Sequence, residues 1–256
     1  MKTAYEENWD QKVIIITGGS SGIGKASALA LSAMNANVIV TGRTERTLEE
    51  SSSVHSNIHP FVADIGDPFS AKKIVDFAIS KFGRIDCLIN NAGAGGMCPI
   101  ENYSDAFIQN MCSINIVGPS MLLNAALPFL KESKGSVVNI CTAVSNNAAP
   151  AIAHYGATKL ALEYLTRSWA IELAPHEIRV NAVAPGPVKT GALTGMMGLD
   201  ESMAEMVEKT EAEQVPLGRR GITQDIVPWI LDFASANNKW TTGQILTVDG
   251  GWSQRS

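Results

Sequence analysis

The feature that most constrains the fold is a series of short apolar runs separated by longer segments with helical periodicity. Most runs are continuously apolar, which is typical of parallel strands that helices cover on both faces. Their alternation with helices predicts a doubly wound α/β fold, built on a parallel sheet of about seven strands. The predicted strands are 12–17, 36–42, 58–64, 84–90, 135–141, 177–184 and 244–250, and the clearest predicted helices are 22–34, 68–82, 105–131, 153–173 and 224–236.

The composition favours one domain of this class and excludes several others. The chain has 256 residues, of which 45% are hydrophobic, and neither a linker nor a repeat divides it, so we expect 1–256 to form a single domain. A net charge of −5 gives no basic surface for nucleic acid, and no uncharged apolar run has the length of a membrane span. The cysteines show no regular spacing, so we expect no metal site and a cytoplasmic location.

The first chemical signal is a glycine cluster directly after the first predicted strand. The stretch IIITGGSSGIG, residues 14–24, places Gly18, Gly22 and Gly24 between that strand and a helix. Such glycines allow a tight turn and a close approach of backbone to a pyrophosphate, which the helix N-terminus then binds. A glycine-rich turn alone is also a common structural device, but this position predicts a dinucleotide site. Within it we also expect contacts from Ser20, Ser21 and Ile23.

The end of the second predicted strand bears on which nicotinamide cofactor would bind. An acidic residue there binds the 2′-hydroxyl of NAD and repels a 2′-phosphate. In this chain Gly42 occupies that position, and Arg43 and Thr44 follow. A guanidinium can bind a phosphate through two parallel hydrogen bonds, so the sequence favours NADP(H) over NAD(H). The alternative is that Arg43 and Arg46 are solvated charges that open a helix.

Further motifs follow in order along the chain. They are NNAG at 90–93, YGATK at 155–159, NAVAPGPVKT at 181–190 and TGQILTVDGGW at 242–252. With TGGSSGIG at 17–24, they make the whole chain resemble the short-chain dehydrogenase/reductase family. The resemblance implies a Rossmann-like fold and hydride transfer between a nicotinamide and a carbonyl or alcohol. It also implies cofactor contacts from Asp64, Ile65, Asn91, Ala92, Gly93, Tyr155, Lys159, Pro185, Gly186, Val188 and Thr190.

Tyr155 and Lys159 lie four residues apart and so share one face of the predicted helix. A neighbouring cation favours a phenolate and should lower the phenol pKa from about 10 towards the working range. In the family that the chain resembles, this tyrosine transfers the proton and this lysine also holds the nicotinamide ribose. Asn115 matches the family's asparagine, which supports a water-mediated proton relay. The alternatives are a packing aromatic for Tyr155 and a buried amide that bridges helix backbone for Asn115.

The hydroxyl group that would complete this site is an open question. Members of the family have a serine thirteen residues before the tyrosine, where this chain has Thr142. Threonine keeps a hydroxyl that can donate, although its methyl group restricts χ1. Ser145 could replace it if the loop after the strand curls tightly, and a site without this donor is the third alternative.

The segment 188–217 falls where the family carries a mobile lid over the substrate. Met196 and Met197 give it an adaptable apolar face, which hints at an apolar substrate but also suits ordinary packing. We expect a small carbonyl or alcohol substrate and an NADP(H)-dependent ketone or aldehyde reductase. An NAD(H)-dependent alcohol dehydrogenase, an epimerase of the same fold and a non-catalytic NADP(H)-binding protein are the alternatives. The resemblance also implies a homotetramer, or a dimer, assembled through helices 105–131 and 155–173.

Overall fold

The strands form one parallel sheet in the order β3-β2-β1-β4-β5-β6-β7. The computed structural model describes residues 9–146 and 148–254. The order of the strands reverses between β1 and β4, which makes the sheet doubly wound and creates the switch point where such sheets bind ligands. The strands are β1 (Val13–Thr17), β2 (Asn37–Gly42), β3 (Ile58–Val62), β4 (Cys87–Asn90), β5 (Ser136–Ile140), β6 (Arg179–Pro185) and β7 (Ile245–Val248).

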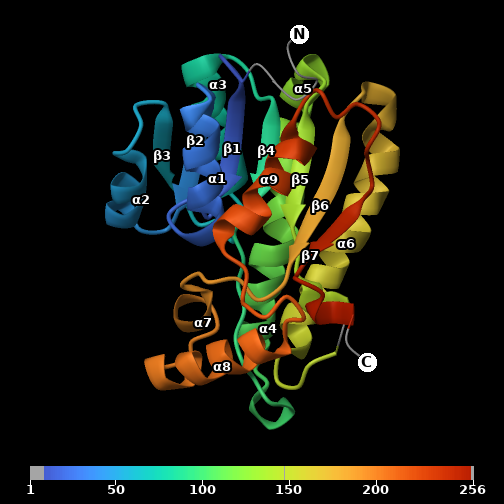
Figure 1. Ribbon diagram of the computed structural model, residues 1–256. Helices are drawn as coiled ribbons and strands as arrows, with labels where there is room; N and C mark the ends of the chain where they lie inside the picture. Colours follow the sequence, from blue (N-terminus) through green and yellow to red (C-terminus); the bar gives the residue numbers. More distant parts are fainter. Residues whose placement is uncertain (1–8, 147, 255–256) are drawn as a thin grey trace.

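Helices cover both faces of this sheet (Figure 1). Alternate residues of β1 enter different cores: Ile14 and Ile16 pack on the side of α1 and α9, whereas Val13 and Ile15 pack on the side of α3 and α5. This burial on both faces explains the continuously apolar runs. The helices are α1 (Gly22–Ala33), α2 (Glu45–Ser52), α3 (Ser70–Phe82), α4 (Asp105–Cys112), α5 (Gly118–Ser133), α6 (Ala153–Leu173), α7 (Ala192–Gly195), α8 (Glu201–Gln214) and α9 (Thr223–Ala234).

The two edge strands depart from the predicted continuous burial. In β3, buried Ile58 is followed by residues that are only partly buried or exposed, ending at exposed Val62. All four residues of β7 are only partly buried. Each edge strand has a neighbour on one side only, so less of its surface is covered. The prediction of full burial is therefore right for the inner strands, apart from their end residues, and wrong for these two edges.

The predicted helix 105–131 is divided into three parts. A π-helical turn, Ser113–Val117, separates α4 from α5. The whole run Asp105–Ser133 is long and apolar enough to cross a membrane by length and composition alone. Of its most apolar window, 44% is buried inside the protein, and α5 packs against α3 and β4.

Three helices, α2, α7 and α8, lie outside the segments with the clearest apolar periodicity. The polar helix α8 buries only Ala204, so it has almost no apolar stripe to detect. Its start is fixed by Asp200, whose carboxylate accepts a hydrogen bond from the Met203 N–H at 2.8 Å. In α2, Arg46 forms an exposed ion pair with Glu50. This arginine is therefore a solvated charge on the surface, as the alternative for Arg46 states.

Candidate active site

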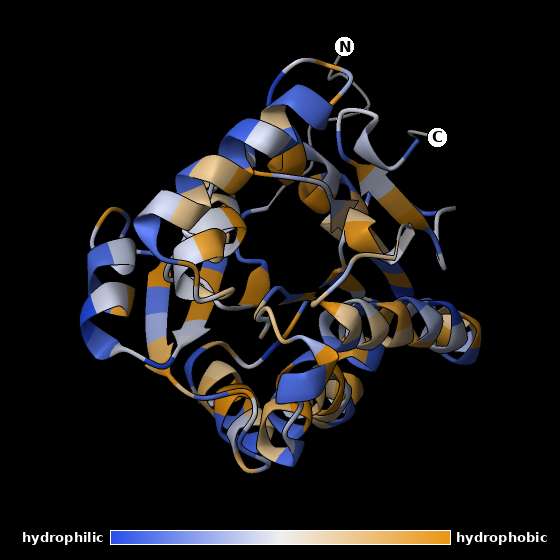
Figure 2. Cartoon of the chain, turned by 90° about the horizontal axis from the view of Figure 1, so that it is seen from below, coloured by the Kyte–Doolittle hydropathy of each residue, from blue (hydrophilic) through white to orange (hydrophobic). Residues whose placement is uncertain are grey.

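A cleft of about 600 Å³ opens at the carboxyl ends of the strands, next to the switch point between β1 and β4. Figure 2 views the molecule from this end, with α7 and α8 in front of the sheet. The predicted site residues that line the cleft are Gly18, Ser20, Ser21, Gly22, Ile23, Arg43, Asp64, Ile65, Asn91, Ala92, Gly93, Thr142, Tyr155, Lys159, Pro185, Gly186, Val188, Thr190, Met196 and Met197. The other predicted residues, Gly24, Thr44, Asn115 and Ser145, do not line it.

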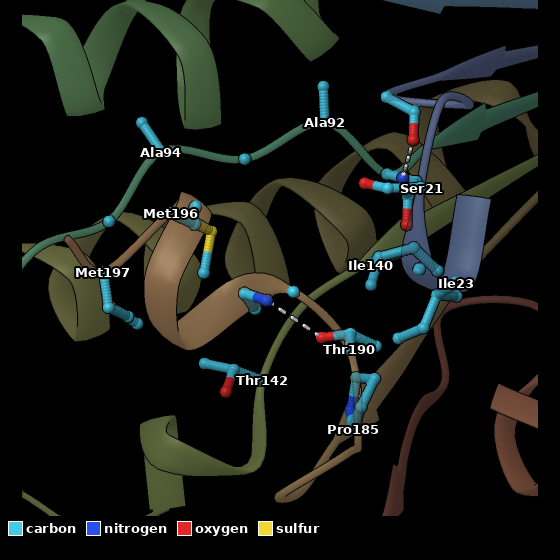
Figure 3. A pocket seen from close by; sticks show the side chains of 18 of the residues that line it. Ser21, Ile23, Ala92, Ala94, Ile140, Thr142, Pro185, Thr190, Met196 and Met197 are labelled. Carbon is cyan, nitrogen blue, oxygen red and sulfur yellow. Dashed lines mark hydrogen bonds between the residues drawn. The ribbon is translucent and has the colours of Figure 1, made fainter. Parts of the chain in front are cut away.

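The glycine-rich turn after β1 has the geometry of a phosphate cradle. Gly18 and Gly22 have φ angles of +67° and +53°, a backbone conformation that favours glycine. Ser21, the N-cap of α1, makes no side-chain cap bond, so N–H groups of the first turn remain available to an anion. Figure 3 shows Ser21 and Ile23 beside the cleft. These residues fit the pyrophosphate of a dinucleotide.

Replacing Gly24 with alanine should destabilise the fold, because this glycine provides packing space. An added Cβ would lie 2.3 Å from the Gly18 carbonyl oxygen and 2.5 Å from Asn91 Nδ2. We expect the free energy of unfolding to fall by about 1–3 kcal/mol, measured by urea denaturation. Gly156→Ala is the matched control, since its Cβ meets nothing within 4 Å and alanine favours a helix. Equal stability of the Gly24 variant and the wild type would contradict the packing argument.

The NNAG segment is hydrogen-bonded to Thr17 and Gly18, where β1 ends and the glycine turn begins. Thr17 Oγ1 accepts hydrogen bonds from the N–H groups of Asn91 and Ala92 at 3.1 and 3.0 Å. The Asn91 side chain donates to the carbonyls of Thr17 and Gly18. A Cβ on Gly93 would lie 3.5 Å from Lys159 Nζ, an ordinary contact distance, so this glycine lies next to that ammonium. Thr17 was not among the predicted site residues, although it begins the TGGSSGIG motif.

Tyr155 and Lys159 lie one turn apart on α6, and both side chains are buried. The Lys159 ammonium donates to the Ile140 carbonyl at 2.8 Å. Burial raises the pKa of Tyr155 to about 12, while a hydrogen bond with the Thr142 hydroxyl acts in the opposite direction. Burial also lowers the pKa of Lys159. The prediction that the ammonium lowers the phenol pKa is therefore wrong for this structure, because desolvation dominates.

Thr142 follows β5 and its hydroxyl is hydrogen-bonded to Tyr155. Figure 3 shows its side chain in the cleft, across from Met196 and Met197. Ser145 is occupied elsewhere: its hydroxyl contacts the Thr142 carbonyl and the carboxylate of Glu163 on α6. The structure thus brings Thr142 to Tyr155 and keeps Ser145 out of the cleft wall.

Asn115 lies in the π-helical turn and is fully buried. Its Oδ1 accepts from the Ala94 N–H, and its Nδ2 donates to the Ala94 carbonyl, both at 2.8 Å. Nδ2 also donates to Thr158 Oγ1 at 2.9 Å, and that hydroxyl donates to the Tyr155 carbonyl. The amide therefore ties the loop after β4 to α6, which matches the structural alternative, and a relay role stays a prediction.

Several residues of the cleft have no local signal in the sequence. Glu211 on α8 and Arg220 after it line the cleft together with Trp252 near the C-terminus. Only the tertiary fold brings them together, although Trp252 ends the last motif. Within the part of the chain that the structure describes, no group of three or more His, Cys, Asp or Glu side chains could hold a metal ion.

Comparisons with known proteins match nearly the whole chain. A family model described as enoyl-(acyl carrier protein) reductase matches residues 18–253. The chain is 32% identical to the 3-oxoacyl-(acyl-carrier-protein) reductase FabG of Thermotoga maritima, over 94% of this chain and 97% of that protein. It is similar to the crystal structure of a short-chain dehydrogenase/reductase of unknown function from Caenorhabditis elegans with cofactor, with a TM-score of 0.91, 31% identity and 97% coverage of each chain. A 3-ketoacyl-(acyl-carrier-protein) reductase from Brucella melitensis complexed with NADH gives a TM-score of 0.88 and 29% identity, over 95% of this chain and 99% of that one.

Proposed function

The chain belongs to the short-chain dehydrogenase/reductase family, and on this premise we propose that it is an NADP(H)-dependent reductase of a ketone or aldehyde. We propose that residues 1–256 act as one dinucleotide-binding and catalytic domain, with 188–217 as the substrate lid. The observation that carries the proposal is the buried arrangement of Thr142, Tyr155 and Lys159 at the wall of one cleft.

In this proposal Tyr155 is the proton donor. A nicotinamide cofactor would supply the hydride when bound, and the phenol gives its proton to the carbonyl oxygen as that oxygen becomes an alkoxide. With its pKa raised to about 12, the Tyr155 phenol is protonated at neutral pH and so carries the proton that carbonyl reduction needs. The Thr142 hydroxyl orients the phenol and the substrate oxygen, and Lys159, one turn along α6, would hold the nicotinamide ribose of a bound cofactor. In alcohol oxidation the Tyr155 phenolate takes the proton back.

The preference for NADP(H) is supported by the surroundings of Arg43. This exposed side chain lines the cleft directly after β2. Among the described residues no carboxylate forms an ion pair with it, so its guanidinium is free to bind a 2′-phosphate. Thr44, the N-cap of α2, makes no side-chain cap bond and can add a hydroxyl.

We also propose a homotetramer, or a dimer, in the cytoplasm. Large apolar side chains are exposed along the helices that the resemblance assigns to subunit contacts, which supports burial against a second copy. They are Val117, Met121, Leu160, Tyr164 and Ile171. The four cysteines all lie in the described chain and form no disulfide there, which suits a reducing compartment.

A panel of ketones and aldehydes, followed by loss of NADPH absorbance and by product analysis, tests the reaction itself. We expect NADPH oxidation with one alcohol formed for each cofactor consumed. Isomerised product without net loss of NADPH would favour the epimerase instead. Cofactor binding without turnover on the whole panel would favour a binding protein.

The roles of Thr142 and Ser145 are distinguished by two alanine variants. Thr142→Ala should lower kcat/KM by about 100-fold or more, because it removes a donor at the reacting oxygen. Ser145→Ala should lower it only a few-fold, since its hydroxyl binds Glu163 instead. Initial rates of NADPH oxidation measure both, with Thr142→Ser as the rescuing variant. The reverse order of effects would transfer the role to Ser145.

A further inference from the structure

The charged side chains of the cleft are unevenly distributed. Among the described residues that line it, the charged ones are Arg43, Asp64, Lys159, Glu211 and Arg220. Arg43 and Asp64 follow β2 and β3, on the side of the sheet where the sequence predicts the adenine ribose. Lys159 lies on α6, and its ammonium donates to the Ile140 backbone carbonyl. Glu211 lies on α8, within the lid segment 188–217, and Arg220 follows that segment, so these two residues set the charge of the cleft at the lid.

Arg220 is a buried cation whose charge is already neutralised. Its side chain is 4% exposed, its Nε lies 2.9 Å from the Glu211 carboxylate, and its Nη1 contacts Glu208. Its Nη2 donates to the Val188 carbonyl at 3.0 Å. Two carboxylates share one guanidinium, so the cluster has an excess of negative charge when both are ionised. An anionic substrate group would find no unpaired cation here.

Glu211 is the acidic member of this cluster that reaches the cleft. Its side chain is 22% exposed and it lines the cavity, whereas Glu208 does not. Burial raises the pKa of Glu211, Arg220 opposes that shift, and the charge of Glu208 adds to it. The Glu211 side chain is only partly exposed, and where solvation is poor, repulsion between like charges is stronger than in water. Binding of a substrate carboxylate next to Glu211 would therefore be strongly disfavoured.

Apolar side chains line much of the rest of the cleft. They include Ala94, Val144, Leu193, Met196 and Met197. Figure 3 shows Ala94, Met196 and Met197 on one side of the cleft and Thr142 on the other. A Cβ on Gly95 would lie 3.0 Å from Met197 Sδ and 3.2 Å from Tyr155 Cδ2, so this methionine lies close to the phenol ring. These flexible side chains can fit apolar bodies of varied shape.

We propose that the cleft selects an uncharged carbonyl compound with an apolar body, and that Glu211 rejects substrates with a carboxylate or phosphate next to the lid. The inference rests on the proposed function, because it names the substrate class of the same site. Apolar walls bind the body of the substrate, while the excess acidic charge at the lid discriminates against anions.

Two ketones of nearly equal shape separate charge from size. These are 4-oxocyclohexanecarboxamide and 4-oxocyclohexanecarboxylate. They share the ring and the ketone, but the first carries an uncharged amide and the second a carboxylate. We expect kcat/KM for the amide to be at least about tenfold higher near neutral pH, since like charges oppose binding of the carboxylate. Initial rates of NADPH oxidation give both values. An equal or higher kcat/KM for the carboxylate would overturn the proposal.

Two variants on the same helix assign the discrimination to one side chain. Glu211→Gln keeps the shape and removes the charge, so the ratio between amide and carboxylate should fall towards one, mainly through a lower KM for the carboxylate. Glu205→Gln is the matched control, because Glu205 is exposed on α8 and does not line the cleft. An unchanged ratio in Glu211→Gln, or an equal fall in both variants, would also overturn the proposal.

Failure of the proposed function gives a different result. A protein that binds NADPH but reduces no ketone of the panel would contradict the reductase assignment alone. Calorimetric titration of the NADPH-bound protein with cyclohexanecarboxamide and cyclohexanecarboxylate then makes the same comparison without turnover. Tighter binding of the amide supports the selection against anions. Tighter or equal binding of the carboxylate, or no binding of either compound, overturns it.

Discussion

Replacing Tyr155 with phenylalanine should lower kcat for carbonyl reduction by about two to four orders of magnitude. The variant keeps the buried ring on α6 but removes the oxygen that is hydrogen-bonded to Thr142. The developing alkoxide would then have no proton donor at this wall of the cleft. Steady-state rates of NADPH oxidation, together with the dissociation constant of NADPH, measure the effect.

The dissociation constant of NADPH should change little, because the loss affects proton transfer and not the glycine turn that fits the cofactor phosphates. Tyr164→Phe is the matched control: Tyr164 lies on the same helix and does not line the cleft. It should keep wild-type kcat. Retention of most activity by the Tyr155 variant would remove the assigned proton donor.

Replacing Arg43 with aspartate should lower the ratio of kcat/KM for NADPH to that for NADH by about 100-fold or more. The wild-type guanidinium lines the cleft after β2, and the variant places a carboxylate where the 2′-phosphate would bind. The charge-assisted hydrogen bonds are lost and repulsion replaces them, whereas an aspartate can accept from the ribose hydroxyls of NADH. Kinetics with both cofactors at one ketone concentration measure the ratio.

Arg46→Asp provides the control for charge alone. Arg46 lies on α2, pairs with Glu50 and does not line the cleft, so its loss should leave the cofactor ratio close to the wild-type value. If the Arg43 variant also keeps the wild-type ratio, the 2′-phosphate must be bound by other residues. Equal shifts in both variants would indicate a long-range effect of net charge.

The order of strands and helices could be predicted because its signals are local. Runs such as 13–16 are continuously apolar since the sheet is covered on both faces. The glycine turn and the YGATK segment are predictable for a similar reason: each carries its residues within one short stretch. Most of the predicted cofactor residues line one cleft because parallel strands end at the same edge.

The features that the sequence did not predict depend on contacts between distant segments. The shift in the pKa of Tyr155 follows from burial, which residue spacing does not reveal. Arg220 meets Glu208 and Glu211 only after the chain has folded back from α8. The bond that keeps Ser145 away from the cleft needs Glu163, eighteen residues further on. No periodicity connects such partners.

The π-helical turn Ser113–Val117 sets the rotation between the helical segments on either side of it. One extra residue in a helix turns everything before it by about 100° relative to everything after it. Here α5 stays packed on α3 while α4 contacts α6 and presents Asn110 to the cleft. A chain one residue shorter at this point would form a smoother helix and lose this orientation. The fold thus retains a local irregularity that regular hydrogen bonding would remove, and the shape of one cleft wall depends on it.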